Sequence, residues 1–379
     1  MRRILLLDLD GVLLQSSGYH ETLRRAVDLL AASLGYRSVQ LSAETIELFE
    51  AAGVTSEWDS AAMCTALLLA RAWDVNPELT LPQSFPLPRA RFHGLEPPDF
   101  SEFARKLGRG VAAGIPALDV AEQLIFSADS RAPDQLQALQ SVLRGARSLP
   151  NSLTFRLVQE LNLGSALFAR TYGLPPVLSC PGLLRRHDRA ALSRRSRSRL
   201  RRWLQRPGHH AAVFTNRPSQ PPDGASGPPE AAIGVAAAGV SFLPVVSMGG
   251  LAWLSQRRGL EPEAFLKPSP VHALAALLHA IGVPMVPALE AAASLGLDGR
   301  GSEAWRPLEG AAVIVFEDSA KGLDSARAAA VHLDRLDIRL DLTLIGVSDR
   351  LPKQQALKAA GAHVVPHLEP ALQAILALP

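Results

Sequence analysis

Two carboxylates near the N-terminus are the side chains of this sequence whose type and spacing most clearly suit chemistry. The apolar run 4–7 is followed by Asp8, Asp10 and Gly11. An unpaired buried charge is costly unless its pKa shifts until the group is neutral, so two acids at the end of a core strand indicate a site that holds a cation. A simple turn is the alternative interpretation, because Asp and Gly are common turn residues.

Polar side chains also follow three later apolar segments. They are Thr215-Asn216-Arg217 after 211–214, Lys267 after 265–266, and Glu317-Asp318 after 312–316. In an open α/β sheet, ligands bind outside the carboxyl ends of the strands. We therefore expect these side chains to meet the two aspartates at one edge of a sheet.

Alternating apolar runs and helical periods predict the elements that position these residues. Strand-like runs lie at 4–7, 211–214, 242–246, 312–316 and 342–347, and the helical stretches among them include 271–281, 322–330 and 357–360. Short continuous apolar strands separated by helices are typical of a parallel sheet covered on both faces. This pattern predicts a doubly wound, Rossmann-like α/β fold with irregular surface loops at 218–232 and 284–310.

The stretch 14–204 contains no convincing strand. Helical periods, with Ser42 and Ser56 as expected caps, predict helices at 21–34, 42–52, 56–73, 99–107, 118–126, 134–144 and 153–161. A length of 379 residues favours two domains, because single cores seldom exceed about 250 residues. We predict a core of residues 1–13 plus 205–379 and a helical insertion of residues 14–204.

Composition narrows the class of protein. A hydrophobic share of 47% with 20% charged residues is typical of a soluble globular chain. No run of about 20 apolar residues occurs, so we expect no membrane span, and the apolar run after Arg2-Arg3 is too short for a secretory signal. Cys64 and Cys180 have no metal-ligand spacing and cannot build a disulfide framework, which favours a reducing, cytoplasmic location.

Arginine is concentrated in residues 185–206, which hold ten arginines and one acid, Asp188. Apolar residues recur there at helical spacing, which predicts an amphipathic basic helix near 185–204 at the end of the insertion. A solvated helix face is one interpretation. A surface for an anionic partner, such as nucleic acid or acidic lipid, is the other, although the lack of aromatic residues apart from Trp203 argues against nucleic acid.

Taken together, the strand-end segments resemble the four ordered motifs of the haloacid dehalogenase-like (HAD) hydrolase superfamily. The motifs are an Asp-x-Asp, a Thr or Ser, a Lys and an acidic pair, and here they are Asp8-x-Asp10, Thr215, Lys267 and Glu317-Asp318. The run Glu317-Asp318-Ser319-x-x-Gly322 looks like the phosphoglycolate phosphatase and β-phosphoglucomutase branch. The resemblance covers the predicted core, and the insertion stands where that family places its first-type cap.

The resemblance implies a Mg²⁺-dependent phosphatase that hydrolyses a small phosphorylated metabolite through an aspartyl-phosphate intermediate. Asp8 would be the nucleophile, and Asp10 the general acid and then the general base. Thr215 and the Asn216 amide would bind phosphoryl oxygens, while Lys267 would steady Asp8 and the phosphoryl charge.

The same resemblance implies a Mg²⁺ site made by Asp8, the Asp10 carbonyl oxygen and Asp318, with Glu317 as a further ligand. Charge supports a cation, because four carboxylates face one lysine and an anionic phosphate must still approach. Retention of Asp10 and of the acidic pair favours phosphoryl transfer over dehalogenation.

Substrate specificity would come from the cap. The segment Ser56-Glu57-Trp58-Asp59 lies where related caps place a specificity loop, but it equally suits the capped N-terminus of a helix. Arg89, Arg91 and His93 could contact an anionic leaving group or lie in a solvated loop.

Two other functions stay open. A phosphomutase of the β-phosphoglucomutase type shares the catalytic set but delivers the phosphoryl group to a sugar hydroxyl instead of water. A non-catalytic binding or regulatory protein would use the basic helix, although the intact catalytic positions argue against it. The sequence identifies neither the substrate, nor the pathway, nor the oligomeric state.

Overall fold

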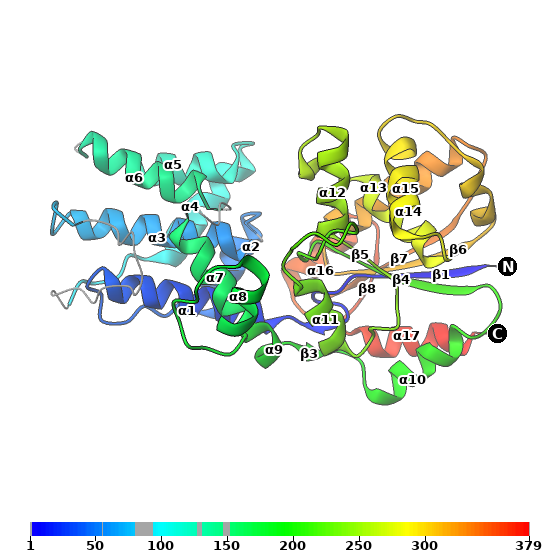
Figure 1. The fold of residues 1–379 in the computed structure, drawn as a ribbon. Coiled ribbons are helices and arrows are strands. Elements are labelled where there is room, and N and C mark those ends of the chain that lie inside the picture. The colour runs from blue at the N-terminus through cyan, green and yellow to red at the C-terminus, as the bar shows by residue number, and fades with distance from the viewer. Residues whose placement is uncertain (1, 55, 80–93, 127–130, 147–151, 379) are drawn as a thin grey trace. The chain divides into compact units, whose positions relative to one another are not determined.

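In the computed structural model of the chain, contacts divide the protein into two compact units (Figure 1). The structure describes residues 2–54, 56–79, 94–126, 131–146 and 152–378. One unit comprises residues 1–16 and 188–379 and contains a parallel sheet, while the other comprises residues 17–187 and is mainly helical. Each unit is described by itself below.

The α/β unit is built on a six-stranded sheet in which all neighbouring strands are parallel. The order across the sheet is β5-β4-β1-β6-β7-β8. The strands are β1 (Arg3–Leu7), β4 (His209–Thr215), β5 (Val245–Ser247), β6 (Ala312–Glu317), β7 (Asp341–Val347) and β8 (His363–Val365). The predicted α/β fold is therefore confirmed, with β8 as an additional edge strand.

Alternate side chains of β1 face opposite sides of the sheet, and each side has its own hydrophobic core. Ile4 and Leu6 belong to one cluster, whereas Leu5 and Leu7 belong to the other. All four side chains are fully buried. Because both faces of a central parallel strand are covered, its sequence is a continuous apolar run and not an alternating one.

Helices cover both faces of this sheet (Figure 1). The first face carries α12 (Met248–Arg258), α13 (Pro270–Ala280), α14 (Met285–Gly296) and α15 (Ala320–Asp334). The second carries α10 (Arg194–Trp203), α11 (Glu230–Ala238) and α17 (Leu368–Ala377). Helix α16 (Leu351–Ala359) connects β7 to β8.

One predicted loop is wrong. The segment 284–310 contains α14 and a short 3₁₀ helix, Glu303–Leu308. Ala288 and Leu289 of α14 are fully buried, as is Trp305 of the 3₁₀ helix. Small alanine side chains let α14 lie close against α13, so this segment extends the core. The segment 218–232 is irregular as predicted until α11 begins at Glu230.

The second unit is a group of helices. They are α1 (Ser17–Ser33), α2 (Ala43–Ala51), α3 (Glu57–Trp73), α4 (Phe100–Ala112), α5 (Ala117–Phe126), α6 (Pro133–Arg144), α7 (Leu153–Leu163), α8 (Ser165–Tyr172) and α9 (Leu183–His187). The first seven match predicted helices. Ser42 caps α2 by accepting a hydrogen bond from the Thr45 amide, whereas Ser56 makes no side-chain cap bond at α3. Among the described residues, every helix is too short or too polar to cross a bilayer.

The basic segment begins in the last helix of the helical insertion and lies mostly beyond it, in the α/β unit. Residues 185–206 form parts of α9 and α10 together with β3 (Arg189–Ala190), which pairs antiparallel with β2 (Leu14–Gln15). Helix α10 buries Leu200 and Trp203 in the core it shares with α17, as the amphipathic pattern predicts. The division of the chain at 16/17 and 187/188 therefore differs from the predicted boundaries at 13/14 and 204/205.

Candidate active site

Sheet topology brings the predicted site residues to one edge of the α/β unit. Strand β1 lies between β4 and β6 and runs parallel to both, so the carboxyl ends of all three strands are neighbours. Asp8 follows β1, Thr215 ends β4 and Glu317 ends β6. The Asp8 amide donates a hydrogen bond to the Phe316 carbonyl oxygen at 2.9 Å, which fixes Asp8 beside the end of β6.

Asp8, Glu317 and Asp318 form a carboxylate cluster in which one oxygen of each residue lies within 4.8 Å of the others. Burial, together with the charge of Glu317, raises the pKa of Asp8 well above its usual range. Burial also raises the pKa of Asp318 to about 6. Buried acids that repel one another favour a bound cation, and oxygen ligands suit a hard divalent ion. The donor set therefore fits the predicted metal site, while the identity of the ion stays a prediction.

Lys267 is buried among these acids. Its Nζ donates to Asp8 Oδ1 at 2.8 Å and also to Glu317 Oε1, and it lies 3.8 Å from the centre of the Phe214 ring. Burial lowers the pKa of this amine, but the charges of Asp8 and Glu317 outweigh burial, so the pKa is raised. Lys267 is therefore a fixed positive charge in direct contact with the predicted nucleophile.

Glu317 organises the loop that carries Asp318. Its Oε2 accepts hydrogen bonds from the Asp318 amide at 3.1 Å, the Ser319 amide at 3.2 Å and the Ser319 hydroxyl at 3.0 Å. Ser319 in turn caps α15 by accepting from the Gly322 amide at 3.2 Å. A Cβ at position 322 would lie 2.6 Å from Glu317 Cγ, so this position needs glycine. Glu317 thus holds Asp318 in place and presents its other oxygen, Oε1, to Lys267.

The carboxylate of Asp10 is paired with Arg217. The Arg217 Nε donates to Oδ1 and Oδ2 of Asp10 at 3.0 and 2.8 Å, and Nη2 donates to Oδ1 at 2.5 Å. The Ser16 hydroxyl also donates to Oδ1, at 2.5 Å. Burial raises the pKa of Asp10, but the charge and hydrogen bonds of Arg217 outweigh burial, so the pKa is lowered. Asp10 is therefore held as a carboxylate, which is the form of a general base and not of a general acid.

Thr215 and Asn216 occupy the adjacent strand end. Thr215 is buried, and its hydroxyl oxygen accepts a hydrogen bond from the Arg217 amide at 3.2 Å, whereas Asn216 is exposed. Because Leu7 of β1 is in register with Val213 of β4, this turn lies beside the turn that follows Asp8. The Thr215 hydroxyl therefore lies at the end of the strand that neighbours β1, and its role in phosphate binding stays a prediction.

Two charged residues of this site, Asp188 and Lys353, were not predicted from the sequence, and Arg217 was expected at this edge of the sheet without a role. Arg217 Nη2 donates to Asp188 Oδ2 at 2.9 Å, and Lys353 Nζ of α16 donates to Asp318 Oδ2 at 2.6 Å. Asp188 could have been suspected, because it is the single acid within a run of arginines. Lys353 offered no such signal, since it lies on a helix with ordinary polar composition.

The predicted specificity segment Ser56–Asp59 lies in the helical unit, away from this cluster in sequence. Ser56 precedes α3, and the next three residues form its first turn, as the helix interpretation expects. Trp58 packs edge-on against Phe155, with ring centres 5.0 Å apart. Arg89, Arg91 and His93 lie outside the described residues.

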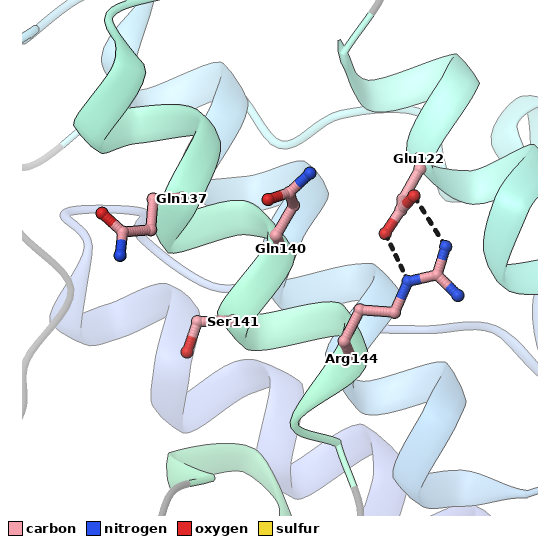
Figure 2. Close-up of a pocket in the computed structure, with 5 residues that line it drawn as sticks. All are labelled: Glu122, Gln137, Gln140, Ser141 and Arg144. Carbon is pink, nitrogen blue, oxygen red and sulfur yellow. Dashed lines mark hydrogen bonds and ion pairs between the residues drawn. The ribbon is translucent and has the colours of Figure 1, made fainter.

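A surface hollow of about 530 Å³ lies in the helical unit between α5 and α6 (Figure 2). Its lining consists of Glu122, Gln137, Gln140, Ser141 and Arg144. Arg144 is already engaged, because its Nε donates to Glu122 Oε1 at 2.6 Å. These lining residues provide neither a nucleophile with its base nor a set of metal ligands. The carboxylate cluster at the edge of the sheet is therefore the better candidate for the active site.

Comparison with protein-family models and with curated proteins finds no match to this chain. Solved structures do match. An X-ray structure of the Northeast Structural Genomics Consortium target ZR25 has a TM-score of 0.59 and 16% identity, and the match covers 99% of this chain and 98% of the other. Phosphatase Tt82 from Thermococcus thioreducens has a TM-score of 0.47 and 14% identity over 98% of each chain. At this identity, the likeness to the first structure shows a shared fold alone.

Proposed function

We propose that this protein is a Mg²⁺-dependent phosphatase of the HAD type that hydrolyses a small phosphorylated metabolite through an aspartyl-phosphate on Asp8. The observation that carries the proposal is the 2.8 Å contact between Asp8 and Lys267 inside a buried carboxylate cluster. The cluster lies at the carboxyl ends of parallel strands, where open α/β sheets bind ligands. A carboxylate held beside a fixed cation suits nucleophilic attack on an anionic phosphate.

In the first step, an Asp8 oxygen attacks phosphorus and the bond from phosphorus to the leaving oxygen breaks. The leaving oxygen keeps the electron pair of that bond and takes a proton, from protonated Asp10 or from solvent. Lys267 offsets charge on the phosphoryl oxygens, and Thr215 donates its hydroxyl hydrogen to them.

In the second step, the Asp10 carboxylate takes a proton from water as the water oxygen attacks phosphorus. The bond between phosphorus and Asp8 breaks, which releases inorganic phosphate and restores the Asp8 carboxylate. Arg217 keeps Asp10 ionised and so suits it to this base role. The ion pair with Arg217 also makes Asp10 a poor proton donor in the first step. We therefore expect substrates whose leaving group departs without a proton to react fastest.

Asp8, Asp318 and the Asp10 carbonyl oxygen would hold Mg²⁺, with Glu317 as a further ligand. When bound, the ion neutralises the clustered acids and draws the anionic substrate toward Asp8. The raised pKa values of Asp8 and Asp318 support this assignment, because burial raises both and the neighbouring lysines offset it only in part, so a bound cation would stabilise the ionised forms.

The helical unit, residues 17–187, takes the role of the cap in this proposal and supplies the substrate contacts that the sheet edge lacks. A lid of this kind protects an acyl phosphate from bulk water. Its insertion point supports the role, since the chain leaves the α/β unit after Ser16, shortly beyond Asp10. The segment Ser56–Asp59 stays a candidate for substrate recognition.

p-Nitrophenyl phosphate tests the proposal, because its leaving group departs without a proton. With Mg²⁺ the protein should release p-nitrophenol and inorganic phosphate, and Asp8→Asn should lower the rate on the order of 10³-fold or more. Chelation of divalent ions should have a similar effect. An Asp8→Asn protein as active as the parent would show the proposal to be wrong, and isomerised sugar phosphate in place of free phosphate would indicate the phosphomutase.

A further inference from the structure

The Arg217 guanidinium lies between the carboxylates of Asp10 and Asp188 in the α/β unit. Its Nε and Nη2 bind Asp10, and the same Nη2 donates to Asp188 at 2.9 Å. The side chain of Arg217 is 2% exposed and that of Asp188 is 0% exposed, whereas 34% of the Asp10 side chain is exposed. Within this triad, Asp10 is therefore the member that substrate can reach.

We propose that Arg217 is a positioning residue that fixes the Asp10 carboxylate for proton transfer, and that Asp188 anchors Arg217. The inference rests on the proposed function and extends it to two residues outside the expected catalytic set. A guanidinium that binds a carboxylate with two nitrogens defines the plane of that carboxylate as well as its distance, which a single point charge does not.

The backbone supports this arrangement from both sides. Asp10 lies four residues before β2, Asp188 directly precedes β3, and these strands pair through Leu14 with Ala190 and Gln15 with Arg189. The same two-stranded ribbon therefore places both acids, while Arg217 enters from the turn after β4. Because Arg217 contacts both acids, its side chain loses conformational entropy when the protein folds. That entropy is then not lost during the reaction.

A glycine in a neighbouring helix makes room for the guanidinium. Gly234 lies inside α11, where glycine is unfavourable for a helix. A Cβ at Gly234 would lie 2.8 Å from Arg217 Nη1 and 2.7 Å from Leu9 Cδ2. The position of the guanidinium is thus built into the packing of α11, which is what a fixed positioning group requires.

The experiment compares Asp10→Asn with a variant that removes the anchor. Because Arg217→Met alone would remove the guanidinium that contacts the buried Asp188 carboxylate, Arg217→Met/Asp188→Asn is the better variant. With p-nitrophenyl phosphate and Mg²⁺, we expect kcat to fall about 10- to 100-fold while KM changes less than about threefold. Asp10→Asn should add little further loss in this background, because both changes act through one carboxylate. Arg217→Lys, which keeps the charge but not the planar fork, should recover part of kcat.

Arg197→Met is the matched control, because Arg197 is a half-buried arginine that donates to the Ala238 carbonyl oxygen at 3.1 Å. It should leave kcat unchanged. If Asp10→Asn lowers kcat but Arg217→Met/Asp188→Asn keeps the parental kcat, the inference is overturned. It is also overturned if the fold-loss in the combined variant equals the product of the fold-losses in Asp10→Asn and in Arg217→Met/Asp188→Asn. An active Asp8→Asn protein is instead a failure of the proposed function.

A crystal structure of Arg217→Met/Asp188→Asn gives a readout that does not depend on turnover. We expect the Asp10 carboxylate to leave its present position or to become disordered. If the carboxylate stays in place, Arg217 does not position it and the inference is overturned, whether or not p-nitrophenyl phosphate is a substrate.

Discussion

Gly11 and Asp318 approach so closely that a Cβ on Gly11 would lie 2.6 Å from Asp318 Cγ. Gly11 also has a φ of +72°, a left-handed conformation that other residues adopt at a cost. Two separate requirements therefore select glycine at this position: the tight turn after Asp10, and space for a carboxylate of the acidic cluster. The first could be anticipated from the sequence, whereas the second is visible only in the folded chain.

Gly11→Ala should therefore damage both stability and metal binding. We expect the free energy of unfolding to fall by more than the ~1 kcal/mol of backbone strain, because Asp318 must also move. Its displacement should weaken Mg²⁺ binding about tenfold or more, since the ligand oxygens would no longer converge. Urea denaturation measures the first effect and calorimetric titration the second.

Gly259→Ala is the matched control for that variant. Gly259 has a φ of +63°, and a Cβ there would meet nothing within 4 Å. Gly259→Ala should lower the free energy of unfolding only by the backbone strain of an alanine at positive φ, and the Mg²⁺ affinity should not change. Equal effects of the two substitutions on ion binding would contradict the steric argument at Gly11.

Lys353 should compete with the metal ion for Asp318. Its Nζ lies 2.6 Å from Asp318 Oδ2, and its side chain is 41% exposed. Removing this positive charge in Lys353→Gln should tighten Mg²⁺ binding about three- to tenfold at low ionic strength and pH 8, with a smaller effect in high salt. Lys358→Gln removes the same charge from an exposed position of α16 and should change the affinity little. Weaker binding in Lys353→Gln would mean that Lys353 orients Asp318 and does not compete for it.

In metal-free protein, the stability that Asp318 contributes should fall as the pH rises from about 4 to 6. The pKa of Asp318 is raised from 3.8 to about 6, so the folded protein binds this proton more tightly than the unfolded chain. The free energy of unfolding therefore falls with rising pH across that window, by up to about 3 kcal/mol from this group. Thermal unfolding of the parent and of Asp318→Asn in a chelator at pH 4.5 and 7 isolates this contribution, because other titrating groups such as His272 act equally in both proteins. A parent and variant with the same pH dependence would contradict the assignment.

Some of this site is readable from sequence because burial leaves a pattern. Strands β1, β4 and β6 are covered on both faces, so their apolar runs and the polar residues that end them stand out. The Asp10–Arg217–Asp188 arrangement leaves no such pattern, because a polar residue after a strand can face either solvent or a neighbour. Helix α14 was missed for another reason: the flanking Pro284 and Gly299 indicate a loop, although the alanines and leucines between them favour the helix that packs on α13.

His272 should make the fold sensitive to acid. It is fully buried on α13, with Nε2 3.3 Å from the Val246 carbonyl oxygen, and burial together with the charge of Lys267 lowers its pKa to about 3. Between pH 6.5 and 3 the unfolded chain binds this proton and the folded protein does not, so the free energy of unfolding falls as the pH falls. From pH 7 to 4.5 the parent should lose about 3 kcal/mol more than His272→Gln in urea denaturation. His363→Gln, at an exposed position, should lose as much as the parent, and equal losses in all three proteins would refute this role for His272.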